Sequence, residues 1–86
     1  MSDMTVVVRY FAAARSAAGT ETEKLHLDEG ATVADLLVAV GTAHGAELAR
    51  VLERCSFLLD EVAVRERGAV LVDGATLDVL PPFAGG

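Results

Sequence analysis

The sequence has almost nothing from which a disulfide, a metal site or a nucleic-acid surface is built. It contains one cysteine, Cys55, so no internal disulfide and no thiolate cluster can form. His26 and His44 add too few ligands for a zinc site, and no metal is expected. Seven basic residues stand against thirteen acidic ones, for a net charge of −6. Nucleic-acid binding draws on clustered Lys and Arg, so we expect no nucleic acid and favour a partner protein with a basic surface.

Long apolar runs and a targeting segment are also lacking. No run approaches the ~20 residues that a membrane span needs. The chain starts with Met1 and an acidic Asp3, where a signal peptide has a basic start and an apolar stretch. We therefore expect a cytoplasmic protein that makes no membrane contact. The 86 residues allow one domain, and a hydrophobic content of 52% argues against disorder.

The first half of the chain predicts two strands and a helix. Residues 5–11 are rich in β-branched and aromatic side chains, and residues 22–27 alternate between apolar and polar, so both predict strands of a hairpin with a wide loop. The loop, 12–19, is either a short helical turn or open. Thr32 begins a helix, with Asp35 completing a capping box. One stripe of this helix is apolar and faces a core, and a left-handed glycine stop is expected at Gly45.

The second half predicts a short helix and further strands. The helix covers 47–54, residues 57–59 and 62–64 form two short strands or one bent strand around Asp60-Glu61, and a last strand covers 76–80. This order indicates an α+β domain, with a mixed sheet of about four to five strands packed on one main helix plus a short second helix. The first and last strands are expected to pair in parallel in the middle of the sheet. We expect the domain at 1–80 and an extended tail at 81–86.

The titratable side chains predict no catalytic set. Cys55 has no neighbouring His to lower its pKa, so we interpret it as a buried structural thiol. His26 is expected in solvent, and His44 near a helix C-terminus, where it interacts with the dipole. The paired carboxylates are expected to be solvated charges in turns, because a chain this small seldom encloses a cleft. These carboxylates are Glu21, Glu23, Asp28, Glu29, Asp60 and Glu61.

The C-terminal tail is the candidate site, although a frayed end without function is the alternative. The last strand runs directly into Pro81-Pro82, which keep the backbone extended. The side chains then shrink along Phe83, Ala84, Gly85 and Gly86. This shape favours insertion into a narrow channel of a partner, with the carboxylate of Gly86 as the reacting group. That carboxylate must be activated, for example as an acyl adenylate, by another protein, since nothing here is suited to bind ATP.

Several segments, in this order and spacing, resemble the ubiquitin-like sulfur carriers of the MoaD/ThiS type, and within them the small subunits of molybdopterin synthase. The segments are the strand and loop at 8–19, the helix start at 30–37, Asp73-Gly74 before the last strand, and the ending from Pro81 to Gly86. The resemblance implies a β-grasp fold. It also implies insertion of the tail, Phe83 onward, into a partner. From the apolar residues around Leu80 and Phe83 we predict an exposed docking patch, with Leu80, Pro81 and Pro82 as the docking residues.

The resemblance further implies a reaction sequence. An E1-like adenylyltransferase uses ATP to adenylate Gly86, and a sulfur donor protein leaves a thiocarboxylate there. The carrier binds no cofactor of its own. It inserts its tail into the large synthase subunit (MoaE type), where sulfur passes to cyclic pyranopterin monophosphate in molybdenum cofactor biosynthesis.

Two departures and three alternatives accompany this interpretation. Family members often have Glu where this chain has Ser16, and an Asn-centred turn where it has Leu59-Asp60-Glu61; both concern partner details. A related carrier for thiazole or cysteine synthesis has the same ending, although Pro81-Pro82 favours the molybdopterin type. A ubiquitin-like modifier joined through Gly86 to lysines is the second alternative, and a plain interaction domain is the third.

Overall fold

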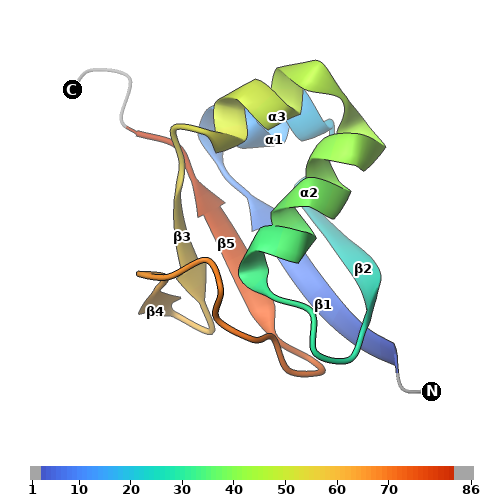
Figure 1. The fold of residues 1–86 in the computed structure, drawn as a ribbon. Coiled ribbons are helices and arrows are strands. Elements are labelled where there is room, and N and C mark those ends of the chain that lie inside the picture. Colours follow the sequence, from blue (N-terminus) through green and yellow to red (C-terminus); the bar gives the residue numbers. More distant parts are fainter. Residues whose placement is uncertain (1–2, 83–86) are drawn as a thin grey trace.

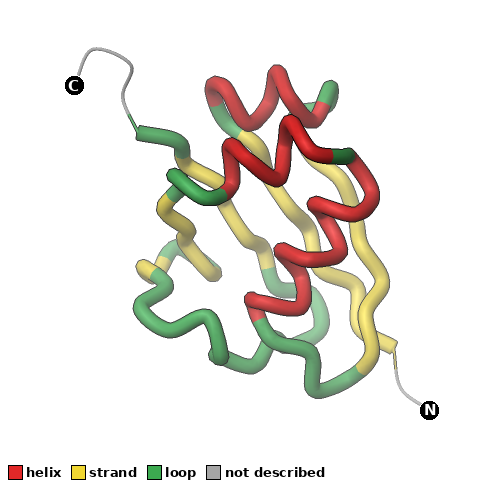
Figure 2. Tube along the Cα trace, turned by 45° about the horizontal axis from the view of Figure 1, so that its top comes forward, coloured by secondary structure: helices red, strands yellow, loops and turns green. Residues whose placement is uncertain are grey.

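The chain folds into a five-stranded mixed sheet with its helices on one side (Figures 1 and 2). The structure is a computed structural model, and it describes residues 3–82. The elements are β1 (Asp3–Tyr10), α1 (Ala12–Ala18), β2 (Thr22–Asp28), α2 (Val33–His44), α3 (Ala46–Leu52), β3 (Ser56–Leu59), β4 (Val62–Ala63) and β5 (Thr76–Leu80). No helix within the described range is long and apolar enough to cross a membrane.

The strand order is β2-β1-β5-β3-β4, with the first and last strands side by side in the middle. β1 pairs in parallel with β5, and the other neighbours are antiparallel. The parallel pairing is possible because the chain crosses over through α2 between the two strands. The predicted mixed sheet and its central pair are therefore confirmed.

The loop between β1 and β2, for which the sequence left two conformations open, is a helix. α1 has Ala14 buried in the core, and Gly19 ends it in the left-handed conformation at φ 77°. The Gly19 N–H donates to the carbonyl of Arg15 at 2.9 Å, which satisfies one of the free carbonyls of the helix end. The wide hairpin is confirmed, and α1 is its connection.

The main helix begins as predicted at Thr32. The Thr32 hydroxyl accepts the Asp35 N–H at 3.2 Å, and the Asp35 carboxylate accepts the Thr32 N–H at 2.9 Å, so the capping box is complete. The apolar stripe is buried as expected: Val33, Leu36, Leu37 and Val40. The C-terminal end of α2 differs from the prediction. Gly45 has φ 100° but ψ −175°, an extended glycine conformation that leads directly into α3 instead of a left-handed cap.

The core lies between the sheet and the helices (Figure 2). Even-numbered residues of β1 point to the helices, because side chains alternate along a strand; they are Met4, Val6, Val8 and Tyr10, all buried. Leu77 and Val79 of β5 continue this layer across the sheet. The opposite side of the sheet has no described helix over it (Figure 1). This side is called the open face below.

A two-residue turn joins β3 to β4, as the sequence predicted for Asp60-Glu61. Both residues are in the left-handed region, Asp60 at φ 47° and Glu61 at φ 70°, which is the geometry of a type I′ hairpin turn. The turn is anchored to β5, because the Asp60 carboxylate accepts the Thr76 N–H at 2.9 Å. The departure from an Asn-centred turn is thus accommodated by a side-chain bond to the neighbouring strand.

Candidate functional site

The predicted site begins where β5 ends. Leu80 is the last residue of β5, pairs with Ser56 at the start of β3, and is half-buried. Pro81 is half-buried and Pro82 exposed. The chain leaves the sheet at the end where α3 leads into β3 (Figure 1). The division into a domain at 1–80 and a tail at 81–86 stays a prediction.

The predicted reacting and inserting residues, Phe83, Ala84, Gly85 and Gly86, lie outside the described residues. The structure therefore places the three docking residues and the end of the sheet from which the tail continues.

Leu80 belongs to the open face, together with neighbours from three strands. Alternation along β5 points Thr76, Asp78 and Leu80 away from the core. Leu58 of β3 lies opposite Asp78 and shares this side. The apolar part of the face consists of half-buried Val7, Leu58 and Leu80, with Phe11 at its margin 40% exposed.

An ion pair crosses the two central strands on this face. The Arg9 guanidinium donates from Nε to Asp78 Oδ1 at 2.6 Å and from Nη2 to Oδ2 at 2.7 Å. The Asp78 side chain is only 8% exposed, whereas that of Arg9 is 45% exposed and lies 5.8 Å from the Phe11 ring centre. The hydrogen bond to Asp78 raises the pKa of Arg9. These two parallel hydrogen bonds satisfy the nearly buried carboxylate of Asp78, and no residue of the hydrophobic core takes part.

This pair was not predicted, since nothing near Asp78 along the chain distinguishes it. The only available signal is the expected parallel pairing of the first and last strands, which brings Arg9 opposite Asp78 when the register is known. Next to the pair is a hollow of about 210 Å³, lined also by Asp60, Glu61 and Thr76. The hollow therefore combines three carboxylates with one guanidinium.

A second polar cluster lies on the helix side and corrects one prediction. Glu23 was expected as a solvated charge, but its side chain is only 23% exposed. Its carboxylate accepts a hydrogen bond from the Tyr10 hydroxyl, and lies 2.8 and 3.0 Å from Nε2 of His44. The pKa of Tyr10 is raised, first by burial and then by this carboxylate. The cluster ties the last residue of α2 to β1 and β2, which is a structural role.

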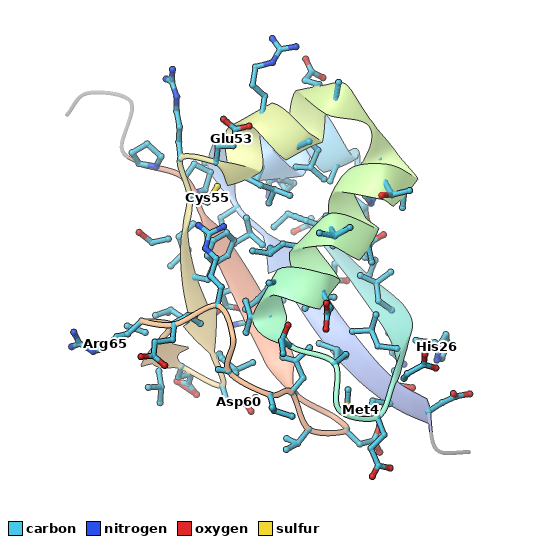
Figure 3. All side chains as sticks on the ribbon, in the orientation of Figure 1. Met4, His26, Glu53, Cys55, Asp60 and Arg65 are labelled. Atoms are coloured by element: carbon cyan, nitrogen blue, oxygen red, sulfur yellow. The ribbon has the colours of Figure 1, made fainter. Side chains whose placement is uncertain are left out.

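The remaining titratable residues lie largely as predicted. Cys55 is buried, its Sγ donates to the Val51 carbonyl at 3.2 Å, and burial raises the pKa of the thiol. It lies at the α3 end of the molecule in Figure 3. His26 is exposed on β2, with Nδ1 3.2 Å from the Thr5 hydroxyl. Within residues 3–82, no group of three or more His, Cys, Asp or Glu is arranged to hold a metal ion.

Comparison with known proteins identifies the family. The ThiS family profile matches residues 8–86, which is nearly the whole chain and includes the tail. The chain belongs to the ThiS family. The predicted class of ubiquitin-like sulfur carriers and the predicted β-grasp fold are thereby confirmed.

Three similar proteins are informative about this ThiS-family chain. A molybdopterin synthase sulfur carrier subunit of Chlamydomonas reinhardtii is 37% identical over 84 residues, covering 96% of this chain and 100% of the relative. The crystal structure of SAMP1 from Haloferax volcanii has a TM-score of 0.85 at 29% identity, covering 95% and 99% of the two chains. A Helicobacter pylori complex of subunits 1 and 2 of molybdopterin-converting factor shares the fold, with a TM-score of 0.66 at 24% identity over 96% and 100%.

Proposed function

We propose that this chain is the small, sulfur-carrying subunit of a molybdopterin synthase and that Gly86 is its reacting residue. The observation that carries the proposal is the 37% identity to a molybdopterin synthase sulfur carrier subunit over the full length of that relative. The family match extends to residue 86, so it includes the two terminal glycines. The position of Pro81 and Pro82 supports the proposal, because two prolines directly after β5 direct the chain away from the sheet.

The chemistry begins with activation by a partner. An E1-like adenylyltransferase joins the Gly86 carboxylate to the AMP portion of ATP and releases pyrophosphate. A sulfur donor protein then supplies the sulfur that displaces AMP and leaves a thiocarboxylate. The absence of a Cβ at Gly86 keeps the carbonyl open on both sides to this attack. The carrier itself holds no cofactor, and we assign it to the cytoplasm because its activation consumes ATP.

Delivery takes place in the large synthase subunit. Phe83 to Gly86 enter a channel of that subunit, and the thiocarboxylate passes sulfur to cyclic pyranopterin monophosphate. Positioning by the tail raises the effective concentration of the nucleophile at a preformed site. Two sulfurs are needed for the dithiolene, so two charged carriers are consumed for each product.

The open face is the proposed docking surface for the large subunit. Leu58 and Leu80 present apolar area on the side of the sheet that no described helix covers, and Leu80 is continuous with the tail. Pro81 and Pro82 extend this area toward the channel. The buried core of a protein interface is more apolar than the rest of the surface and depleted of charged residues, and its rim is polar.

Intact-mass spectrometry tests the proposal. The chain is incubated with an E1-like enzyme, ATP and a sulfur donor, and we expect a gain equal to one sulfur replacing one oxygen, located at Gly86. A variant with one alanine added after Gly86 is the control, and we expect it to keep its stability but to gain no sulfur. An unchanged mass of the natural chain, with an enzyme active on another carrier, would sink the proposal.

A protein modifier is the second candidate, because the fold is also that of SAMP1, a small archaeal modifier protein, at 29% identity. Conjugates between Gly86 and lysines of other proteins, stable to thiol reductants, would favour it. The carrier for thiazole or cysteine synthesis is distinguished by the acceptor. A charged carrier that produces molybdopterin with the large synthase subunit supports the present proposal.

A further inference from the structure

The acidic charge of the molecule is concentrated at the end of the sheet opposite the tail. In Figure 3, Asp60 and Met4 lie at one end and Glu53 and Cys55 at the other. Strand pairing, the α2 cap and two side-chain bonds to the backbone bring six carboxylates to the Asp60 end: Asp3, Asp28, Glu29, Asp35, Asp60 and Asp73. Arg65 of the loop after β4 also lies on the Asp60 side in Figure 3, next to the carboxylate-bearing Glu66.

The tail end has a different charge balance. Arg50 and Arg54 are exposed and line a hollow of about 300 Å³ together with Glu47 and Val51. Neither arginine lies within 4.0 Å of a carboxylate among the described residues. Arg54 is two residues before Ser56, which pairs with Leu80, so this pair flanks the point where the tail leaves.

The described side chains at this end sum to a neutral charge. Arg15 of α1 lies 3.5 Å from Glu21, and Glu47 and Glu53 are the other nearby carboxylates. Three arginines therefore balance three glutamates. At the opposite end Arg65 and the neighbouring Glu66 cancel, which leaves the six carboxylates in excess. The molecule is an electric dipole whose negative end is remote from the reactive tail.

This dipole decides how the carrier approaches a charged partner. A basic partner surface would attract the remote end first and leave the tail pointing outward. A partner with carboxylates would repel that end and attract Arg50 and Arg54, which turns the tail toward it. We infer that the partner surface beside the channel for the tail carries carboxylates that receive Arg50 and Arg54. This inference rests on the proposed function and reverses the basic partner expected from net charge alone.

The test is the rate of association with the large synthase subunit. The double variant R50E/R54E should associate about tenfold more slowly at low salt, and the difference should shrink at about 0.5 M salt. The single variant R54E is compared with R65E, which makes the same charge change at an exposed loop arginine beside β4. We expect R54E to slow association and R65E to leave it nearly unchanged. The neutral variant R50Q/R54Q is used if the double reversal does not fold.

Each outcome supports or overturns the inference. Unchanged or faster association of R50E/R54E overturns it, as does an equal slowing by R54E and R65E, which would show a response to net charge. The proposed function is judged separately, by whether the unaltered carrier binds the large subunit and gains sulfur. If the unaltered carrier binds the large subunit and gains sulfur, but its association rate does not depend on Arg50 and Arg54, the inference is refuted and the proposed function stands.

Discussion

The two faces of the sheet differ in composition and in what they contribute. Val6 and Val8 of β1 point to the helices and are completely buried, while Val7 and Arg9 between them point to the open face and keep contact with solvent. The first face holds the hydrophobic core, from which the folding free energy is drawn. The second face is only partly covered by its own side chains, so a partner can bury it without disturbing the core.

Each face also holds a carboxylate with little solvent exposure, and the two are satisfied in different ways. Glu23 on the helix side bonds to Tyr10 and His44, within the core layer. Asp78 on the open face bonds to Arg9, whose outer part stays in solvent. The difference indicates that the Glu23 cluster belongs to folding, while the Arg9–Asp78 pair gives the docking side a fixed and polar centre.

The largest effect is expected from truncating a core residue of α2. Leu36→Ala should lower the free energy of unfolding by about 2–5 kcal/mol, because it removes buried methyl groups and leaves a cavity. Leu58→Ala on the open face should cost less than about 1.5 kcal/mol, since Leu58 is half-buried. Urea denaturation of both variants measures the two unfolding free energies. Equal decreases would show that the two faces contribute equally to stability.

Neutralising the carboxylate of the helix-side cluster should have the next largest effect on stability. Glu23→Gln should cost about 1–2 kcal/mol, because hydrogen bonds to a charged group are replaced by weaker ones. Glu21→Gln is the matched control, two residues earlier, with a side chain that is 79% exposed, and should change stability by less than about 0.5 kcal/mol. Thermal unfolding distinguishes them, and similar melting temperatures would indicate that Glu23 is solvated after all.

A substitution on the open face should affect binding to the large subunit more than folding. Leu80→Ser should weaken binding to the large subunit by about tenfold, which is about 1.4 kcal/mol, since interface cores rely on apolar contacts. Its unfolding free energy should change by less than that amount, because Leu80 is at the end of β5 and only half-buried. Calorimetric titration gives the affinity, and unaltered binding would remove Leu80 from the docking surface.

The smallest effect concerns pH. Burial raises the pKa of the Cys55 thiol, and burial with Glu23 raises that of Tyr10, so the folded state favours the neutral forms of both groups. Their stabilising contributions are therefore present below the ordinary thiol and phenol pKa values and are lost as pH rises through the raised ones. Alkylation at pH 8 should be much slower for the native chain than for the chain in urea. Equal rates would show that Cys55 is not protected.

Much of the architecture was predictable because it depends on neighbours within a few residues. The Thr32 capping box, the buried stripe of α2 and the turn at Asp60-Glu61 were predicted from local spacing and are present. Helix caps and side-chain periodicity act within one or two turns of the chain, so the sequence contains them directly. The second helix is present as well, with bounds of Ala46–Leu52 in place of 47–54.

Residues 12–19 mark the limit of such local reasoning. Small, loosely patterned side chains are compatible with a helix or a loop, and the burial of Ala14 against the core selects the helix. The Glu23 prediction failed for a similar reason. An isolated carboxylate in an alternating strand looks solvated, and its partner His44 is 21 positions away.

The class of the protein, the order of its elements apart from α1, and the proline-glycine ending on which the functional proposal depends all follow from the sequence. Which charges lie together follows from the tertiary fold. It paired Arg9 with Asp78 across 69 positions, and it placed six carboxylates at one end and Arg50 and Arg54 near the tail. The physical reason is that propensity and capping act along the chain, whereas ion pairing and charge separation depend on distances in space, which the sheet register sets.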